Sequence, residues 1–351
     1  MIVGIDNTPL TSPHKVRGVG FYTKRLIKAL GKIAKKDKAF SLKTGKAKDL
    51  ISGVDLIHYP FFDPFFLTLP IIKKKPTVAT VHDLVPLRFP NHFPLGIRGK
   101  LKWLLQRLSL KNAEAIITDS QTSKKDIVRF AGLKEDKVFV VYLAANKIFK
   151  PITDKQQLEK IRKKLKLPKK FVLYVGDLNF NKNVNLLAES CLGLKYPLVI
   201  VGKQAVDKSY DKSHPENQPL LNLQNLANKN PNKIIRLGFL ETNLLVKVYN
   251  LATVYCQPSL AEGFGLPILE AMACGCPVVT SKKTSLSEIA GKAALLVNPS
   301  KPKELSQTLE NCWTKQSVRM RLSKLGLKQA AKFSWEKTAS QTLEVYKKVY
   351  D

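Results

Sequence analysis

Short apolar runs alternate with amphipathic stretches along the whole chain, and this alternation restricts the fold more than any other feature. The runs have the length of strands buried on both faces, and the stretches between them have helical periodicity. Parallel strands need long crossover connections, usually helices, so the pattern predicts α/β, doubly wound parallel sheets. The expected strands are residues 2–6, 54–59, 78–81, 115–118, 138–142, 171–175, 198–201, 234–237, 254–257, 278–280 and 295–297.

The strand pattern begins anew near residue 171, after a lysine-rich helical stretch at 155–170. The 351 residues are enough for about two domains. We therefore predict two tandem Rossmann-like domains, residues 1–150 and 151–334, followed by a helix at 335–351 that packs back on the first domain. Ligands of such sheets bind at the carboxyl ends of the strands, so we expect the active site in a cleft between the domains.

The net charge is +32, and 49 lysines outnumber 10 arginines. Guanidinium groups bind bases and phosphates in bidentate fashion better than ammonium groups do, so this balance argues against sequence-specific nucleic-acid binding. A diffuse lysine coat does attract anionic lipids, which makes an anionic membrane surface a candidate partner. The alternative is that the lysines are merely solvated.

Composition also bears on the compartment. The chain has five cysteines, an odd number, and they lack the spacing of metal ligands. We therefore expect reduced, buried thiols. The first residues show no signal-peptide pattern, and no apolar stretch approaches the roughly 20 residues of a spanning helix. We expect a cytoplasmic protein, peripheral on the inner face of the cell membrane if the lysine coat binds lipid.

Two glutamates eight residues apart, Glu262 and Glu270, bracket a glycine turn at 263–265. The turn follows an expected strand and precedes an expected helix, so it presents backbone N–H groups at the helix N-terminus, where anions bind. Glu262 is expected beside the anion. Glu270, about one turn into the helix, would reach a neighbouring hydroxyl. The alternative is an ordinary strand–turn–helix.

Three further candidates follow expected strands. Gly18 and Gly20 open a helix but lack the third glycine of a dinucleotide fingerprint, so we expect no nicotinamide cofactor; a plain tight turn is the alternative. Lys182 stands where an ammonium neutralises a diphosphate, unless it is an ordinary surface lysine. His82 can take a proton or bond a sugar hydroxyl, unless it caps a loop.

The helix expected at 99–111 carries an apolar side and several lysines. Together with the phenylalanines at 61–66 it has the composition of a surface that touches a bilayer. The alternative, which we favour, is an ordinary helix that faces the core. Its apolar side consists of Leu101, Leu104, Leu105 and Leu108.

These motifs together resemble glycosyltransferase family 4, retaining enzymes of the GT-B fold. The stretch 258–277 is similar to the E-x7-E signature of that family, and the order of the other motifs covers nearly the whole chain. The supporting motifs are Gly18-Val19-Gly20, Thr80-Val81-His82-Asp83, residues 118–127, residues 176–182, Leu237-Gly238-Phe239, residues 287–291 and residues 333–335.

The resemblance implies a role for each matching residue. Glu270 holds the ribose hydroxyls of a nucleotide-sugar donor, Glu262 contacts the hydroxyls of the sugar, and Lys182 stabilises the departing diphosphate. His82 lies close to the donor sugar and the acceptor. The remaining donor-binding residues are Gly18, Gly20, Phe239, Gly263, Phe264, Gly265 and Leu266. No metal or other cofactor is implied.

One departure from the family pattern concerns the phosphate site. Family members commonly have an arginine five residues before the lysine, and this chain has Asp177 there. Lys203, after the next strand, is a candidate substitute for the missing cation.

The expected reaction moves a hexosyl unit, of mannosyl or glucosyl type, from a nucleoside-diphosphate sugar to a hydroxyl of a glycan or lipid-linked acceptor. Its expected place is cell-surface polysaccharide synthesis. Two alternatives stay open. One is a non-catalytic polyanion-binding protein on the same fold, which the net charge of +32 favours. The other is a nucleotide-sugar epimerase.

Overall fold

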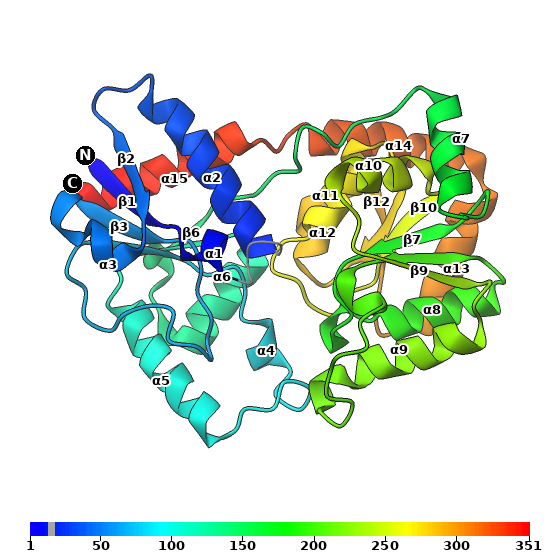
Figure 1. The fold of residues 1–351 in the computed structure, drawn as a ribbon, viewed down its shortest axis with the longest axis horizontal. Coiled ribbons are helices and arrows are strands. Elements are labelled where there is room, and N and C mark those ends of the chain that lie inside the picture. Colours follow the sequence, from blue (N-terminus) through cyan, green and yellow to red (C-terminus); the bar gives the residue numbers. More distant parts are fainter. Residues whose placement is uncertain (13–17) are drawn as a thin grey trace. The chain divides into compact units, whose positions relative to one another are not determined.

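A computed structural model describes residues 1–12 and 18–351, and these residues form two compact units (Figure 1). Unit 1 comprises residues 1–90, 95–143 and 333–351. Unit 2 comprises residues 91–94 and 144–332. The predicted boundary lies at residue 150, and the expected C-terminal helix belongs to unit 1.

Unit 1 is built on a six-stranded sheet with the order β2-β1-β3-β4-β5-β6, in which all neighbouring strands are parallel. The strands are β1 (Ile2–Asp6), β2 (Ser41–Gly45), β3 (Leu56–Tyr59), β4 (Thr77–Thr80), β5 (Ala115–Thr118) and β6 (Val138–Val140). The helices are α1 (Thr8–Thr11), α2 (Gly18–Ala34), α3 (Ala47–Leu50), α4 (Val85–Arg88), α5 (Ile97–Lys111), α6 (Gln121–Ile127) and α15 (Trp335–Tyr350).

The last helix, α15, packs against α2 and against the central strands β3, β4 and β5. Its buried residues recur at helical spacing and include Ala339, Leu343 and Tyr346. Ser334 caps its N-terminus by accepting a hydrogen bond from the Lys337 backbone N–H at 3.1 Å. The C-terminal segment thus completes the core of a sheet formed by the first part of the chain.

Unit 2 also has a six-stranded, wholly parallel sheet, in the order β12-β11-β10-β7-β8-β9. The strands are β7 (Val172–Val175), β8 (Leu198–Val201), β9 (Ile234–Gly238), β10 (Val254–Gln257), β11 (Val278–Ser281) and β12 (Ala294–Val297). The helices are α7 (Lys155–Lys164), α8 (Val184–Gly193), α9 (Gln218–Lys229), α10 (Thr242–Leu251), α11 (Leu266–Ala273), α12 (Ser285–Ala290), α13 (Pro302–Thr314) and α14 (Gln316–Ala330).

The strand orders locate the point in each sheet where ligands bind. In unit 2 the chain runs outward from β7 through β8 to β9, then returns to β10 and runs outward the other way. The direction reverses between β7 and β10, and sheets of this kind bind ligands beside such a reversal. In unit 1 the corresponding reversal lies between β1 and β3. The β7 and β10 loops carry the predicted Lys182 and Glu262.

Candidate functional site

The loops after β7 and β10 are bound to each other at the carboxyl edge of the unit 2 sheet. The Leu260 backbone N–H donates to the Asn181 carbonyl oxygen at 2.7 Å, and Asn181 Nδ2 donates to the Ala261 carbonyl oxygen at 3.0 Å. Asn183, which has a left-handed φ of 55°, donates from Nδ2 to the Pro258 carbonyl oxygen at 3.2 Å. This bonding fixes the position of one loop relative to the other.

The predicted residues Lys182 and Glu262 form an ion pair across these loops. The Lys182 Nζ atom lies 2.7 Å from Glu262 Oε2, and the two side chains are 22% and 8% exposed. Lys182 ends a short 3₁₀ turn, and Asn183 then turns the chain into α8. The turn therefore aims the ammonium group back at the β10 loop. A pair this short and this sheltered is held more firmly than an exposed surface pair.

The second oxygen of Glu262 is bound by two residues of its own loop. Gln257 Nε2 and Ser259 Oγ each donate to Glu262 Oε1 at 2.7 Å. The Tyr255 hydroxyl donates in turn to Gln257 Oε1 at 2.8 Å, which orients the amide. Neither Gln257 nor Ser259 was predicted. The carboxylate is thus held in a fixed orientation by three short hydrogen bonds.

The glycine turn after Glu262 is fixed by its conformation and by one serine. Gly265 has φ +109°, and a Cβ atom there would lie 2.3 Å from Leu286 Cδ2. Ser285 Oγ donates to the carbonyl oxygens of Glu262 at 2.9 Å and Phe264 at 3.1 Å. Helix α11 begins at Leu266, directly after the turn. Glycine is therefore required where the loop enters the helix.

Glu270 lies on α11 and is half-buried. The Tyr249 hydroxyl of α10 donates to Glu270 Oε2 at 3.2 Å. Burial, followed by the Glu270 charge, raises the pKa of Tyr249, so this hydroxyl stays protonated and keeps donating. Phe239 follows β9 and Gly238 and is 54% exposed.

The loops after β7 and β8 come into close contact at two glycines. A Cβ atom on Gly202 would lie 2.2 Å from the Gly176 carbonyl oxygen, so only glycine fits. Asp177, at the position of the family's arginine, is exposed, and its carbonyl oxygen accepts from the Tyr174 hydroxyl at 2.6 Å. Lys203 is exposed directly after Gly202. Its proposed role as the missing cation stays a prediction.

His82 lies in unit 1 and is paired with an acid that was not predicted as a site residue. It follows β4, and its Nδ1 lies 2.7 Å from Asp119 Oδ2, which follows the neighbouring strand β5. Burial opposes protonation of His82, but the charge and hydrogen bond of Asp119 outweigh it and raise the pKa of His82. Because β4 and β5 end at the same sheet edge, the sequence did carry this signal: each residue follows an apolar strand.

Three polar atoms at this pair are buried without a hydrogen-bond partner among the described residues: His82 Nε2, Asp119 Oδ1 and Thr118 Oγ1. Buried polar groups are nearly always bonded to protein or to an ordered molecule. The His82 pair thus has bonding capacity for a ligand or water.

A second histidine, His58, is wholly buried beside the first. Its Nδ1 lies 2.6 Å from the Tyr346 hydroxyl of α15 and its Nε2 lies 2.7 Å from Thr80 Oγ1. The Tyr22 hydroxyl lies 3.0 Å from the same Thr80 oxygen, and the Tyr22 ring meets the His82 ring edge-on at a centroid distance of 4.7 Å. Burial, and then the proximity of His82, lowers the pKa of His58 to about 3.

Gly18 and Gly20 lie in the first turn of α2. Gly18 is exposed and a Cβ atom there would meet nothing within 4 Å, whereas Gly20 is buried. The residues that precede this turn, 13–17, lie outside the described residues.

Residues 1–12 and 18–351 contain neither a cluster of metal ligands nor a membrane-spanning helix. None of their His, Cys, Asp and Glu side chains form a group of three or more that is suited to holding a metal ion. None of their helices combines the length and the apolar character needed to cross a bilayer.

Comparison with known proteins gives matches over most of the chain. The family described as Glycosyltransferase Family 4 matches residues 16–146, and the family described as Glycosyl transferases group 1 matches residues 156–329. The O-antigen chain mannosyltransferase B of Escherichia coli is 30% identical over 280 residues, which are 77% of this chain and 70% of that protein. The serotype-specific mannosyltransferase WbdA of Escherichia coli is 29% identical over 76% of this chain. This chain spans about a third of the length of the WbdA relatives that it matches.

Solved structures share the fold at lower sequence identity. The sucrose-phosphate synthase of Thermosynechococcus elongatus has a TM-score of 0.76 at 18% identity and covers 100% of this chain and 99% of its own. Anabaena HepE in complex with UDP-glucose has a TM-score of 0.74 at 18% identity, and the match covers 99% of this chain and 100% of HepE. The predicted fold of two Rossmann-like parallel α/β domains is confirmed.

Proposed function

This chain belongs to glycosyltransferase family 4 of the group 1 glycosyl transferases, and we propose that it transfers a hexosyl unit from a nucleoside-diphosphate sugar to a hydroxyl of a glycan or lipid-linked acceptor, with retained configuration. The observation that carries this proposal is the ion pair of Lys182 and Glu262 at the reversal point of the unit 2 sheet. The pair brings a cation and an oriented carboxylate together where sheets of this kind bind ligands.

In the proposed reaction Lys182 stabilises the negative charge that develops on the departing diphosphate. The 3₁₀ turn places its ammonium group at the edge of the sheet, so that on donor binding the group has only to turn from Glu262 to the diphosphate. In the absence of donor, the Glu262 carboxylate neutralises the positive charge of Lys182 at a distance of 2.7 Å. Catalysis of this type rests on positioning and electrostatics rather than on a covalent step.

Glu262 is assigned to the hydroxyls of the donor sugar. Gln257 and Ser259 hold one of its oxygens, so the carboxylate keeps its orientation when Lys182 turns toward the diphosphate. The oxygen that faces Lys182 is then the one that accepts from the sugar. An acceptor-only group with a fixed direction selects hydroxyls at defined positions of the ring.

The rest of the donor is assigned to α11 and its neighbours. Glu270 would accept from the ribose hydroxyls, and Tyr249 limits its rotation. The backbone from Gly263 to Leu266, at the N-terminus of α11, would bind the sugar and the distal phosphate. The exposed Phe239 would contact the base.

His82 is assigned to the donor sugar and the acceptor. Its Nδ1 is occupied by Asp119, so Nε2 is the ring nitrogen left for substrate, and because this atom is buried the side chain would have to turn to make that contact. Gly18 and Gly20 are assigned to the donor side as well. These assignments stay predictions, and no metal is part of the proposed reaction.

The names of the relatives favour a mannosyl donor among the open choices. Both Escherichia coli relatives are named mannosyltransferases, whereas Anabaena HepE was solved with UDP-glucose. We therefore place GDP-mannose first in a donor screen, with UDP-glucose second. An O-antigen chain enzyme among the relatives supports a role in cell-surface polysaccharide synthesis. A place at the inner face of the cell membrane stays a prediction.

Incubation of the purified chain with UDP- and GDP-sugars and a panel of free and lipid-linked acceptors tests the proposal. We expect transfer, or slow hydrolysis of one donor when no acceptor fits. Glu262→Gln is expected to abolish most of this activity, while Glu189→Gln, an exposed glutamate of α8, leaves it unchanged. Folded protein without transfer, hydrolysis or nucleotide-sugar binding would contradict the proposal. Salt-dependent binding of nucleic acid in that case would favour the polyanion-binding alternative, for which the net charge of +32 speaks.

A further inference from the structure

The apolar side of α5 faces solvent, and the prediction that it faces the core is wrong. Ile97 is 89% exposed, Leu101 58%, Leu104 60% and Leu108 48%. Their spacing of i, i+4, i+7 and i+11 places them in one stripe along the helix. From Ile97 to Leu108 the stripe is about 16 Å long, at about 1.5 Å per residue. A helix on the surface of a globular domain normally turns such a stripe inward.

Polar residues occupy the buried side of α5 and fix its rotation. Gln106 and Ser109 are both wholly buried. Gln106 Oε1 accepts from the Leu69 backbone N–H at 3.1 Å, and its Nε2 donates to the Leu69 carbonyl oxygen at 2.9 Å. Ser109 Oγ donates to the Pro70 carbonyl oxygen at 2.6 Å. Turning the leucines inward would break these bonds and leave buried polar groups unpaired, so the outward stripe is built into the fold.

The loop that is bonded to the buried side of α5 also exposes apolar side chains. Phe66 is 62% exposed, Leu67 63% and Ile72 81%, and the bonds of Gln106 and Ser109 to residues 69–70 hold this loop beside the helix. We call these three residues and the four of the stripe the α5 patch. Large apolar side chains exposed together on one helix and on the loop bonded to it mark a place of interaction.

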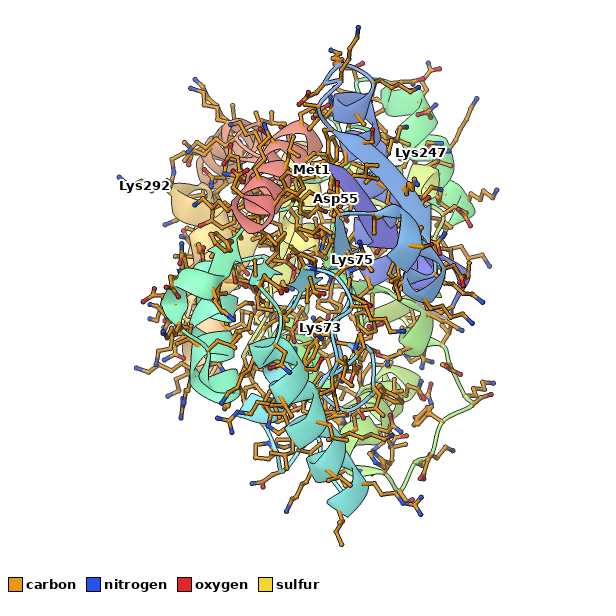
Figure 2. The ribbon with its side chains drawn as sticks, turned by 90° about the vertical axis from the view of Figure 1, so that its left-hand side faces the viewer. Met1, Asp55, Lys73, Lys75, Lys247 and Lys292 are labelled. Atoms are coloured by element: carbon orange, nitrogen blue, oxygen red, sulfur yellow. The ribbon has the colours of Figure 1, made fainter. Side chains whose placement is uncertain are left out.

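Cations surround the α5 patch. Helix α5 carries Arg98, Lys100, Lys102, Arg107 and Lys111 and no acidic residue. The Lys102 Nζ atom lies 5.2 Å from the centroid of the Phe66 ring. Lys73, Lys74 and Lys75 follow Ile72, and the Lys73 Nζ atom lies 2.7 Å from Ser109 Oγ of the helix. Figure 2 shows the labelled Lys73 and Lys75 above the cyan helix α5.

We propose that the α5 patch docks this chain on an anionic lipid bilayer. The exposed leucine, isoleucine and phenylalanine side chains, flanked by long cationic side chains, enter the boundary between acyl chains and headgroups while the cations bind lipid phosphates. A second copy of the chain fits the patch poorly, because an isologous contact would place these cations against their own copies. The inference rests on unit 1 alone and goes beyond the proposed reaction.

Sedimentation with vesicles tests this proposal directly. Wild-type protein is expected to sediment with vesicles of equal parts phosphatidylcholine and phosphatidylglycerol, and far less with phosphatidylcholine alone. The variant Leu101→Gln/Leu104→Gln/Leu108→Gln is expected to bind the anionic vesicles at least about tenfold more weakly. The matched control is Met320→Gln on α14, which removes a side chain that is 65% exposed in unit 2. It is expected to bind as the wild type does.

The contribution of the cationic side chains to vesicle binding is tested by a separate variant and by the salt dependence of binding. Lys100→Gln/Lys111→Gln is expected to weaken binding to anionic vesicles severalfold and to reduce its salt dependence. Donor hydrolysis by the triple leucine variant is expected to equal that of the wild type, so failure of the docking proposal is distinguishable from failure of the proposed reaction.

Three results would overturn the proposal. The first is equal binding of wild type and triple leucine variant to anionic vesicles while the variant remains folded by circular dichroism. The second is equal binding of the wild type to neutral and anionic vesicles. The third is a wild-type dimer, by sedimentation equilibrium without lipid, that the triple variant abolishes while vesicle binding is absent; this would assign the patch to a second copy.

Discussion

The two units each hold a part-buried pair of a basic and an acidic side chain at the carboxyl edge of a parallel sheet, and the two pairs differ in how completely they are bonded. In unit 2 both oxygens of Glu262 are occupied, by Lys182 on one side and by Gln257 and Ser259 on the other. In unit 1 the pair of His82 and Asp119 leaves His82 Nε2 and Asp119 Oδ1 buried and without partners among the described residues.

The sources of the bonding groups differ as well. Glu262 takes two partners from within five residues of itself, so a short segment of chain carries most of its site. The polar groups around His82 come from β3, β4, α2 and α15 and from the end of β5, and the bond between His58 and Tyr346 joins residues 288 positions apart. The geometry of the Glu262 site therefore depends mainly on one short segment of the chain. The geometry around His82 depends in addition on the packing of the C-terminal helix α15.

The largest expected effect is on turnover in unit 2. Lys182→Met removes the only cation within 4 Å of Glu262 among the described residues. It should lower kcat roughly 100- to 1000-fold, because a developing charge loses its stabilising group. Steady-state kinetics measures this. Lys233→Met, at an exposed lysine before β9, should leave kcat unchanged. Equal kcat for the Lys182 variant and wild type would remove Lys182 from the proposed reaction.

The next effect concerns the stability of the loops that frame the unit 2 site. Gly202→Ala places a Cβ atom 2.2 Å from the Gly176 carbonyl oxygen. The backbone has to move apart, which should cost about 2–3 kcal/mol of unfolding free energy. Urea titration followed by circular dichroism measures the loss. Gly193→Ala, where the added atom meets nothing within 4 Å, serves as the control. A loss no larger than that of the control would show that the loops are not held together at Gly202.

A smaller effect is expected for the long-range bond in unit 1. Tyr346→Phe leaves His58 Nδ1 buried without its hydroxyl partner. The expected cost is about 2 kcal/mol of unfolding free energy. Tyr350→Phe, at an exposed tyrosine of the same helix, should change stability by less than about 0.5 kcal/mol. If both variants unfold at the same urea concentration, α15 does not depend on this bond.

The smallest effect is a pH dependence with opposite signs for the two histidines of unit 1. The pKa of His58 is lowered to about 3, so its contribution to stability is present above the unfolded pKa and is lost as the pH falls below it. Acidification from pH 7.5 to 5.5 should cost about 1.4 kcal/mol through His58. The pKa of His82 is raised, so its contribution is present at low pH and is lost as the pH rises through its folded pKa.

Urea titrations at the two pH values separate these contributions. His58→Gln should flatten the loss of stability on acidification, and His82→Gln should steepen it. The same change of slope in both variants would contradict the opposite signs.

The apolar strands of both sheets were predicted to within a residue or two, because parallel strands buried on both faces read as unbroken apolar runs. Strand β2 was missed for the same reason. It is an edge strand of sequence Ser-Leu-Lys-Thr-Gly whose residues are mostly exposed, so no apolar run marks it.

The candidate site residues of the unit 2 loops were chosen from local motifs, and the structure brings Lys182 and Glu262 together. The orientation of α5 was not predictable in this way. Its apolar spacing predicts an inward face, but Gln106 and Ser109 find backbone partners in a loop some 37–39 residues away, and those bonds turn the leucines outward. Pairing across such separations is decided by tertiary contacts, which a periodic pattern does not contain.

Glu262 and Glu270 are proposed to bind different parts of the same donor, and the kinetics of matched variants test this proposal most directly. Kinetics of donor turnover should show for Glu262→Gln a kcat lowered roughly 100-fold with KM changed less than about threefold. For Glu270→Gln, KM should rise about tenfold with kcat nearly unchanged. Glu189→Gln on α8 should match the wild type in both constants. If Glu262→Gln and Glu270→Gln change kcat and KM to the same extent, or change neither constant, the two carboxylates do not have the different roles proposed for them.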